Sequence, residues 1–160
     1  MGLISLPPLE INAWSEKSLY NLALEISEIT QRLLILVDGI AGSGKTTLAE
    51  KLARELNADI IHTDDVSWNA DPVHWDGEML DCIVTPWLNG NKIAYRPTGW
   101  VKENRTGTID IDPNKALIIE GMGASRKSLR EFAAYSIWVD TEPLIARKRA
   151  VQRDIAAGAD

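Results

Sequence analysis

A glycine-rich segment, Gly39 to Thr47, has the clearest chemistry in the sequence. It reads GIAGSGKTT and satisfies the pattern G-x-x-x-x-G-K-[ST], directly after an apolar run and before a segment with helical spacing. Glycines permit positive φ angles and close approach to phosphates, and successive N–H groups at a helix N-terminus attract anions. The segment therefore predicts a nucleoside triphosphate site. The residues expected to bind the phosphates are Gly39, Ala41, Gly42, Ser43, Gly44, Lys45, Thr46 and Thr47.

Individual side chains of this segment have separate expected roles. Lys45 would reach the β and γ phosphates, and the hydroxyl of Thr46 would bind Mg²⁺. Ser43 and Thr47 add hydrogen-bond donors around the phosphates. The expected cofactors are therefore ATP and Mg²⁺, whereas the reaction depends on residues elsewhere in the chain.

Acidic residues follow two further apolar runs. Asp64 and Asp65 come directly after the run that ends at His62, and Glu120 follows the run 116–119. A carboxylate at Asp64 could accept a proton from a substrate hydroxyl or bind the metal, and Glu120 would lie near Mg²⁺. The alternative is structural: one aspartate caps the next turn, and Glu120 is a solvated acid at a strand end.

The last helical segment is strongly basic. It contains Arg147, Lys148, Arg149 and Arg153. Arginines near a transferring phosphoryl group neutralise the charge that spreads over its oxygens. A basic helix face is equally typical of plain solvation, so this feature alone does not decide between the two interpretations.

Aromatic residues occur where the helical and strand periodicity is weak. Trp68, Trp75 and Trp100 fall in expected loops, where they could stack on a base or ring, or pack in the core. His62 and Cys82 have no metal-ligand spacing, and we interpret both as structural.

An alternation of strands and helices would position these residues. Apolar runs predict strands at 33–37, 59–62, 116–119 and 136–139, and helical spacing predicts helices at 15–31, 45–56, 77–88 and 142–155, the first capped by Ser15. Between 90 and 114, short strands at 92–95 and 108–111 suggest a substrate-binding insertion. We expect one α/β domain over residues 1–160, with a three-layer P-loop NTPase fold and a mostly parallel sheet of about four strands.

Composition excludes several classes of protein. The chain has 160 residues and 17.7 kDa, which is enough for one domain. Its net charge of -6 disfavours a nucleic-acid binder, and no apolar run is long enough for a membrane span. With one cysteine and no signal-peptide pattern, we expect a cytoplasmic protein.

The order of the motifs resembles that of the uridine kinase and phosphoribulokinase group of P-loop kinases, over about residues 33–154. The resemblance implies that Asp64 is the base toward the substrate hydroxyl. It also implies that Glu120 lies near the metal and that the helix at 142–155 is a lid whose arginines close over the phosphates. The motifs that carry it are the glycine-rich segment, Asp64-Asp65, Glu120-Gly121 and Arg149-x-x-x-Arg153-Asp154.

The segment 90–105, GNKIAYRPTGWVKENR, resembles the substrate hairpin of that group. Uridine kinases have a Tyr-Asp pair after this proline, whereas this chain has Thr98-Gly99-Trp100, which disfavours uridine as the substrate. The expected acceptor contacts are Asp65, Trp68, Tyr95, Trp100 and Arg105.

The resemblance implies an ATP- and Mg²⁺-dependent phosphotransferase that moves the γ-phosphate to a hydroxyl of a small molecule, such as a nucleoside or related metabolite. A nucleoside monophosphate kinase is one alternative, in which Arg96, Lys102 and Arg105 would bind the acceptor phosphate. A nucleotide-binding module without transfer is another. The absence of a fifth core strand after the last helix favours it, whereas the intact Lys45, Thr46, Asp64, Glu120 and lid arginines oppose it, because a pure binder needs no base aimed at an acceptor. A homodimer is left open. The expected catalytic residues are Lys45, Asp64, Arg149 and Arg153, and the expected metal ligands are Thr46, Asp64 and Glu120.

Overall fold

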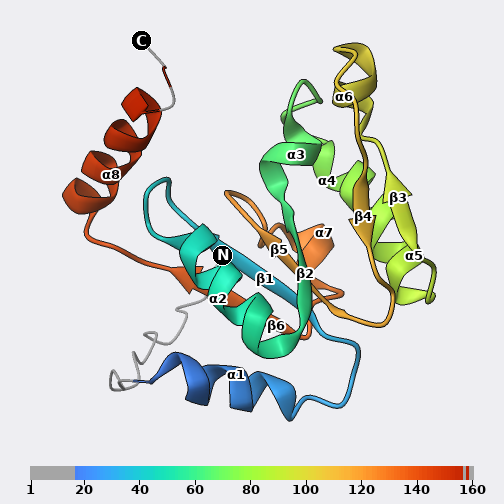
Figure 1. Ribbon diagram of the computed structural model, residues 1–160, viewed down its shortest axis with the longest axis horizontal. Helices are drawn as coiled ribbons and strands as arrows, with labels where there is room; N and C mark the ends of the chain where they lie inside the picture. Colours follow the sequence, from blue (N-terminus) through green and yellow to red (C-terminus); the bar gives the residue numbers. More distant parts are fainter. Residues whose placement is uncertain (1–16, 157, 159–160) are drawn as a thin grey trace, which may run out of the picture.

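The computed structural model describes residues 17–156 and residue 158. Strands and helices alternate along the chain, as the sequence predicts (Figure 1). The helices are α1 (Leu19–Ser27), α2 (Lys45–Leu56), α3 (Thr63–Ser67), α4 (Trp75–Met79), the π-helical segment η1 (Leu80–Val84), α5 (Thr85–Leu88), α6 (Thr98–Lys102), α7 (Lys127–Arg130) and α8 (Pro143–Ala156). The strands are β1 (Leu34–Gly39), β2 (Ala58–His62), β3 (Ile93–Tyr95), β4 (Ile109–Ile111), β5 (Ala116–Glu120) and β6 (Tyr135–Val139).

The main sheet is parallel and has the strand order β2-β5-β1-β6. Its register places Val37 beside Glu120, and Glu120 beside His62. Because the carboxyl ends of parallel strands meet at one edge, this pairing brings the glycine-rich loop after β1 close to the acids that follow β2 and end β5. The predicted α/β fold with a parallel sheet of four strands is confirmed.

Side chains alternate between the two faces of the sheet, and each face has its own apolar cluster. Leu34 and Leu36 of β1 face α4, η1, α5 and α7, whereas Ile35 and Val37 face α1 and α2. Burying both faces explains why β1 is a continuous apolar run. The helix residues of the two clusters include Met79, Ile83, Trp87 and Leu129 on the first face, and Ala23, Ile26, Ala49 and Leu52 on the second.

One helical rod covers most of the first face. We predicted a helix over 77–88; the rod begins earlier, at Trp75, and passes through α4, η1 and α5 without a break. Pro86, near the start of α5, has no N–H and its ring would clash with a carbonyl one turn earlier. The wider π turn of η1 lies directly before this proline, where it relieves that clash.

The insertion between α5 and β5 is an antiparallel hairpin of β3 and β4 with α6 at its tip (Figure 1). Gly99 lets α6 pack closely on the end of α3, because a Cβ atom there would lie 1.8 Å from the carbonyl oxygen of Trp68. The indole N–H of Trp100 donates to the carbonyl of Asp65 at 2.7 Å. Trp100 is therefore a buried residue of a short helix, whereas the sequence predicts a loop.

The N-terminal helix is shorter than predicted. Ser18 caps α1 by accepting the N–H of Asn21 at 3.1 Å, and α1 ends at Ser27, four residues before the expected end at 31. The proposed cap at Ser15 lies outside the described residues. No helix in the described part of the chain combines the length and the hydropathy needed to cross a membrane.

Candidate functional site

The glycine-rich loop connects β1 to α2 and has the geometry of a phosphate-binding loop. Gly44 caps α2 with a φ of 97°, so the first N–H groups of the helix face the loop. Lys45 is buried, and its Nζ donates to the carbonyl of Ile40 at 2.9 Å. The buried hydroxyl of Ser43 has no hydrogen-bond partner among the described residues. Both side chains can therefore donate to an anion in the loop without breaking a stronger interaction.

Asp38 holds the start of this loop against the loop after β5. It is 5% exposed, and its carboxylate accepts the N–H of Gly39 at 2.7 Å, of Gly123 at 3.1 Å and of Ser125 at 2.9 Å. These bonds fix the position of Glu120, which directly precedes the second loop. The sequence patterns above assign no role to Asp38; the signal that could have found it is a carboxylate directly after an apolar run.

Glu120 is the centre of the acidic part of the site. Its carboxylate is buried, accepts the hydroxyl of Thr46 at 3.2 Å and lies 2.6 Å from Nδ1 of His62. The hydrogen bond to Glu120 raises the pKa of His62 against the opposing effect of burial, and the charges of Asp64 and Asp65 raise it further. His62 is thus a residue of the site. Its spacing in the sequence fits no metal site and predicts a structural role, which is why the sequence alone does not indicate it.

Within residues 17–156, no group of three or more His, Cys, Asp or Glu side chains could hold a metal alone. Mg²⁺ does not require such a group, since it commonly binds one or two carboxylates together with phosphates and water. Thr46 and Glu120 are brought together as such a pair, whereas Asp64 is exposed in the first turn of α3.

The arginines of α8 line the same cavity as the glycine-rich loop. This cavity measures about 230 Å³. Helix α8 packs directly on the loop, because a Cβ atom on Gly42 would lie 2.0 Å from the carbonyl oxygen of Ala146. The hydroxyl of Thr141, just before α8, donates to the carbonyl of Ser43 at 2.9 Å. The lining residues are Gly42, Gly44, Lys45, Thr46, Thr47, Arg149 and Arg153.

The predicted acceptor contacts fall into two groups. Arg105 lies 3.7 Å from the ring centre of Trp100 and 5.6 Å from that of Trp68, and its guanidinium approaches Asp65 at 3.5 Å. These four residues form a cluster between α3 and the hairpin. The hydroxyl of Tyr95 instead donates to Glu78 of α4 at 2.7 Å, and burial is the main cause of its raised pKa.

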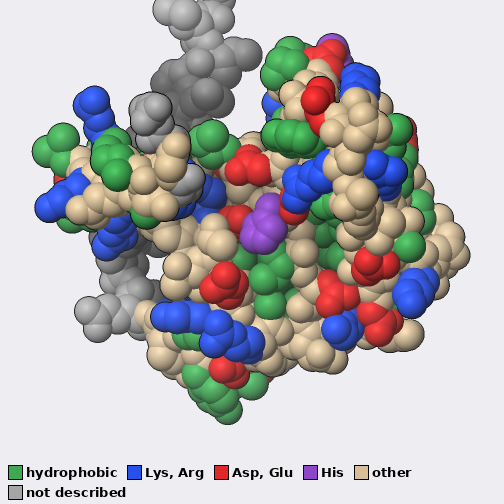
Figure 2. Space-filling model, turned by 45° about the horizontal axis from the view of Figure 1, so that its top comes forward, with side chains coloured by type: hydrophobic (Ala, Val, Ile, Leu, Met, Phe, Trp, Pro, Cys, Tyr) green, Lys and Arg blue, Asp and Glu red, His purple; other side chains and the backbone are tan. Residues whose placement is uncertain are grey.

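The surface is hollowed between α8 and the hairpin arm (Figure 2). Acidic and histidine side chains gather in this hollow, and Lys and Arg side chains flank it on both sides. Acids between two basic walls match a site where a metal and a hydroxyl meet a phosphate chain.

Solved structures with similar folds are kinase-like. A protein assigned as a possible uridine kinase from Bacillus stearothermophilus has a TM-score of 0.58 and 18% identity over 87% of this chain and 88% of its own. A protein assigned, also provisionally, as a fructose transport system kinase from Silicibacter sp. TM1040 has a TM-score of 0.62 and 19% identity over 91% of this chain and 85% of its own. At these identities the likeness shows the fold.

Sequence comparison gives the family. No curated protein matches this chain significantly. A family model described as an AAA domain matches residues 35–157, from the first core strand through the last helix. The resemblance to P-loop kinases that the motifs indicated is confirmed at the level of fold and family. The chain belongs to this AAA-domain family of P-loop proteins.

Proposed function

We propose that this protein is an ATP- and Mg²⁺-dependent phosphotransferase that moves the γ-phosphate of ATP to a hydroxyl of a small molecule, such as a nucleoside or a related metabolite. The observation that supports it most is the meeting of three groups at one sheet edge. Lys45 and Thr46 of the loop and the arginines of α8 line one cavity. Glu120 of β5 accepts the hydroxyl of Thr46 at this cavity, and the acids of α3 follow the neighbouring strand.

The loop fits a triphosphate and its metal. Ser43 has a buried hydroxyl without a partner in the described part of the chain, and Lys45 donates only to a backbone carbonyl. Thr46 and Glu120 would hold Mg²⁺ from the protein side, and the ion would neutralise negative charge on the phosphates. Arg149 and Arg153 would contribute positive charge from α8, on the opposite wall of the cavity.

Asp64 is the proposed base. It lies in the first turn of α3, two residues after the end of β2. The last residue of β2 is His62, which contacts Glu120. Asp65 is engaged by Arg105, whereas no ion pair of Asp64 is present in the described residues. An exposed carboxylate without a cationic partner can accept the proton of an incoming hydroxyl.

The charge around α3 favours an uncharged acceptor. The cation of Arg105 is matched by Asp65, and Nε of Arg96 donates to the carbonyl of Arg105 at 2.8 Å. Asp64 has no ion pair within the described residues, so its carboxylate would repel a phosphomonoester placed beside it. A nucleoside or sugar hydroxyl is therefore a better acceptor than a nucleoside monophosphate.

The test is ADP release from ATP and Mg²⁺ across a panel of nucleosides, nucleoside monophosphates and sugars. We expect one uncharged acceptor to stimulate ADP release, and we expect Asp64→Asn to remove about 99% of that stimulation, the lower range for loss of a general base. Asp81→Asn is the matched control, because Asp81 is exposed on the helical rod away from the loop. ATP binding without stimulation by any acceptor would instead support a nucleotide-binding module, and stimulation by monophosphates alone would support a monophosphate kinase.

A further inference from the structure

A second hollow adjoins the phosphate cavity and extends it away from the acids. It measures about 500 Å³ and lies between the start of α1, one side of α2 and α8. Gly44, Thr47 and Arg149 line both hollows, so the two are continuous. The remaining lining residues are Leu19, Leu48 and Lys51.

The lining of the second hollow suits a flat ring rather than another phosphate. Leu19 and Leu48 present aliphatic surface, and the stem of Lys51 adds more of it. Arg149 lines this hollow as well as the phosphate cavity, and arginine stacks readily on aromatic rings. The volume is within the usual range for small-molecule sites.

The direction of the second hollow also fits a nucleotide. Thr47 and Lys51 are one turn apart on α2, so they lie on the same side of that helix. A triphosphate that lies across the N-terminus of α2 would leave the phosphate cavity past Thr47, which lines both hollows. In a nucleotide, the α-phosphate carries the ribose and the base, which would then enter the second hollow.

We propose that this hollow binds the nucleobase of the ATP, with Leu19 of α1 as one wall, Leu48 and Lys51 as the floor and Arg149 opposite. The inference rests on the nucleotide site of the proposed function. It assigns a binding role to α1, which precedes residues 35–157 and so lies outside the family match. In this chain α1 would complete the nucleotide site.

Helix α1 is held firmly enough to form a wall. Ala23 and Ile26 are buried against α2 and the sheet. Glu25 accepts the hydroxyl of Tyr135 in β6 at 3.0 Å and also pairs with Lys17. Leu19 is one turn before Ala23 on the same face of α1 and packs against the same apolar cluster. Its position is therefore already fixed, and little ordering is needed when a base binds.

The test compares two probes, MgATP and tripolyphosphate with Mg²⁺, by isothermal titration calorimetry. Leu19→Ala removes apolar surface from the base wall but nothing from the phosphate cavity. We expect it to weaken MgATP binding about fivefold and to leave tripolyphosphate binding unchanged. Lys51→Ala should weaken MgATP binding in the same selective way. Leu24→Ala is the matched control, since Leu24 is in the same helix, is 49% exposed and lines a different hollow.

Each result has a definite meaning. Unchanged MgATP affinity in Leu19→Ala, an equal loss for both probes, or the same loss in Leu24→Ala would overturn the base site. Selective loss in a protein that binds ATP but transfers no phosphate would support the base site while contradicting the phosphotransferase. Failure of the wild-type protein to bind either probe would contradict both, because no nucleotide site would exist.

Discussion

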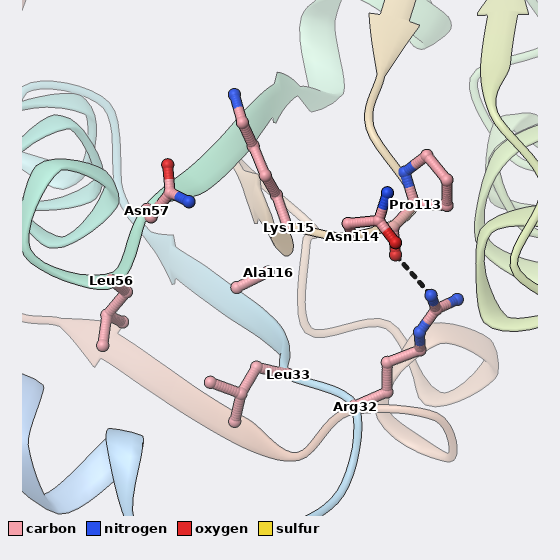
Figure 3. Close-up of a pocket in the computed structure, with 8 residues that line it drawn as sticks. All are labelled: Arg32, Leu33, Leu56, Asn57, Pro113, Asn114, Lys115 and Ala116. Carbon is pink, nitrogen blue, oxygen red and sulfur yellow. Dashed lines mark hydrogen bonds between the residues drawn. The ribbon is translucent and has the colours of Figure 1, made fainter.

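The two ends of the parallel sheet are both hollowed, but they differ in whether the polar side chains there already have hydrogen-bond partners. At the amino end, a hollow of about 410 Å³ lies beside the first residues of β1 and β5 (Figure 3). Arg32 there donates to the carbonyls of Trp87 and Pro113, and Lys115 nearby donates to Asp59 at 2.9 Å. At the carboxyl end, the buried Ser43 hydroxyl of the phosphate loop has no partner within the described residues. The buried indole N–H of Trp87 has none either, but Trp87 does not line the amino-end hollow.

This difference shows why hollow volume alone does not locate a site. The amino-end hollow is larger than the phosphate cavity of about 230 Å³, although it is smaller than the adjoining hollow of about 500 Å³. Its cations, however, are already bound by protein oxygens, so an anionic ligand would have to replace good hydrogen bonds. The carboxyl end has donors that folding leaves unused, together with the N-terminus of α2.

Among the variants that test this comparison, Lys45→Met should have the largest effect on activity. Among residues 17–156 the side chain of Lys45 makes one hydrogen bond, to the carbonyl of Ile40, so the melting temperature should change little. Loss of its charge beside the γ-phosphate should lower kcat about 100- to 1,000-fold. ADP release with the best acceptor and thermal melting would be measured on the same sample. A variant that keeps a tenth of the wild-type rate would show that Lys45 does not hold the transferring group.

Glu120→Gln should have the next largest effect. The amide keeps the shape and can still accept from Thr46, but it loses the charge that Mg²⁺ prefers. We expect the apparent Mg²⁺ affinity during turnover to fall about 10- to 100-fold. The measurement is the ADP release rate over a Mg²⁺ titration at saturating ATP. A rate that falls equally at every Mg²⁺ concentration would argue for a role of Glu120 outside metal binding.

The carboxyl end could be predicted from the sequence because its residues follow local patterns. The helix over 45–56 begins and ends as predicted, since the loop glycines and the apolar spacing both define it. The same local signals predicted Glu120 at the end of β5, and the structure places it against Thr46. Assignment of each residue to a chemical role stays a prediction that the variants above test.

The features that the sequence did not reveal depend on contacts between distant segments. His62 became a site residue only because parallel register sets it beside Glu120, 58 residues later. The α6 helix depends on Gly99 packing on Trp68, which no periodicity indicates. The role of α1 at the second hollow likewise requires knowledge of how it packs on α2.

Arg32→Ala probes the amino end, where we expect an effect on stability alone. Removing the guanidinium takes a charged donor from the carbonyls of Trp87 and Pro113, although the carbonyl of Trp87 still accepts the N–H of Gly90 at 2.9 Å. It also removes a cation stacked 4.9 Å from the ring centre of Trp87. The free energy of unfolding should fall by about 2 kcal/mol, because hydrogen bonds from charged donors exceed neutral ones. Urea unfolding checks this value. The affinity for MgATP, measured by calorimetry, should match that of the wild type. A weaker affinity would mean that the amino end of the sheet also contacts the nucleotide, contrary to the comparison.

Lys115→Met is the amino-end counterpart of Lys45→Met, and its expected effect is the smallest. Both changes remove a lysine charge, but the ammonium of Lys115 is matched by Asp59, with side-chain exposures of 36% and 20%. Partly exposed pairs add little stability and are screened by salt. We therefore expect kcat/KM within about twofold of wild type, and a small decrease in Tm that disappears at high salt. Turnover lost to the same extent as in Lys45→Met would mean that the two ends are coupled through the sheet, because Lys115 lies beside the amino end of β5 and Glu120 ends the same strand.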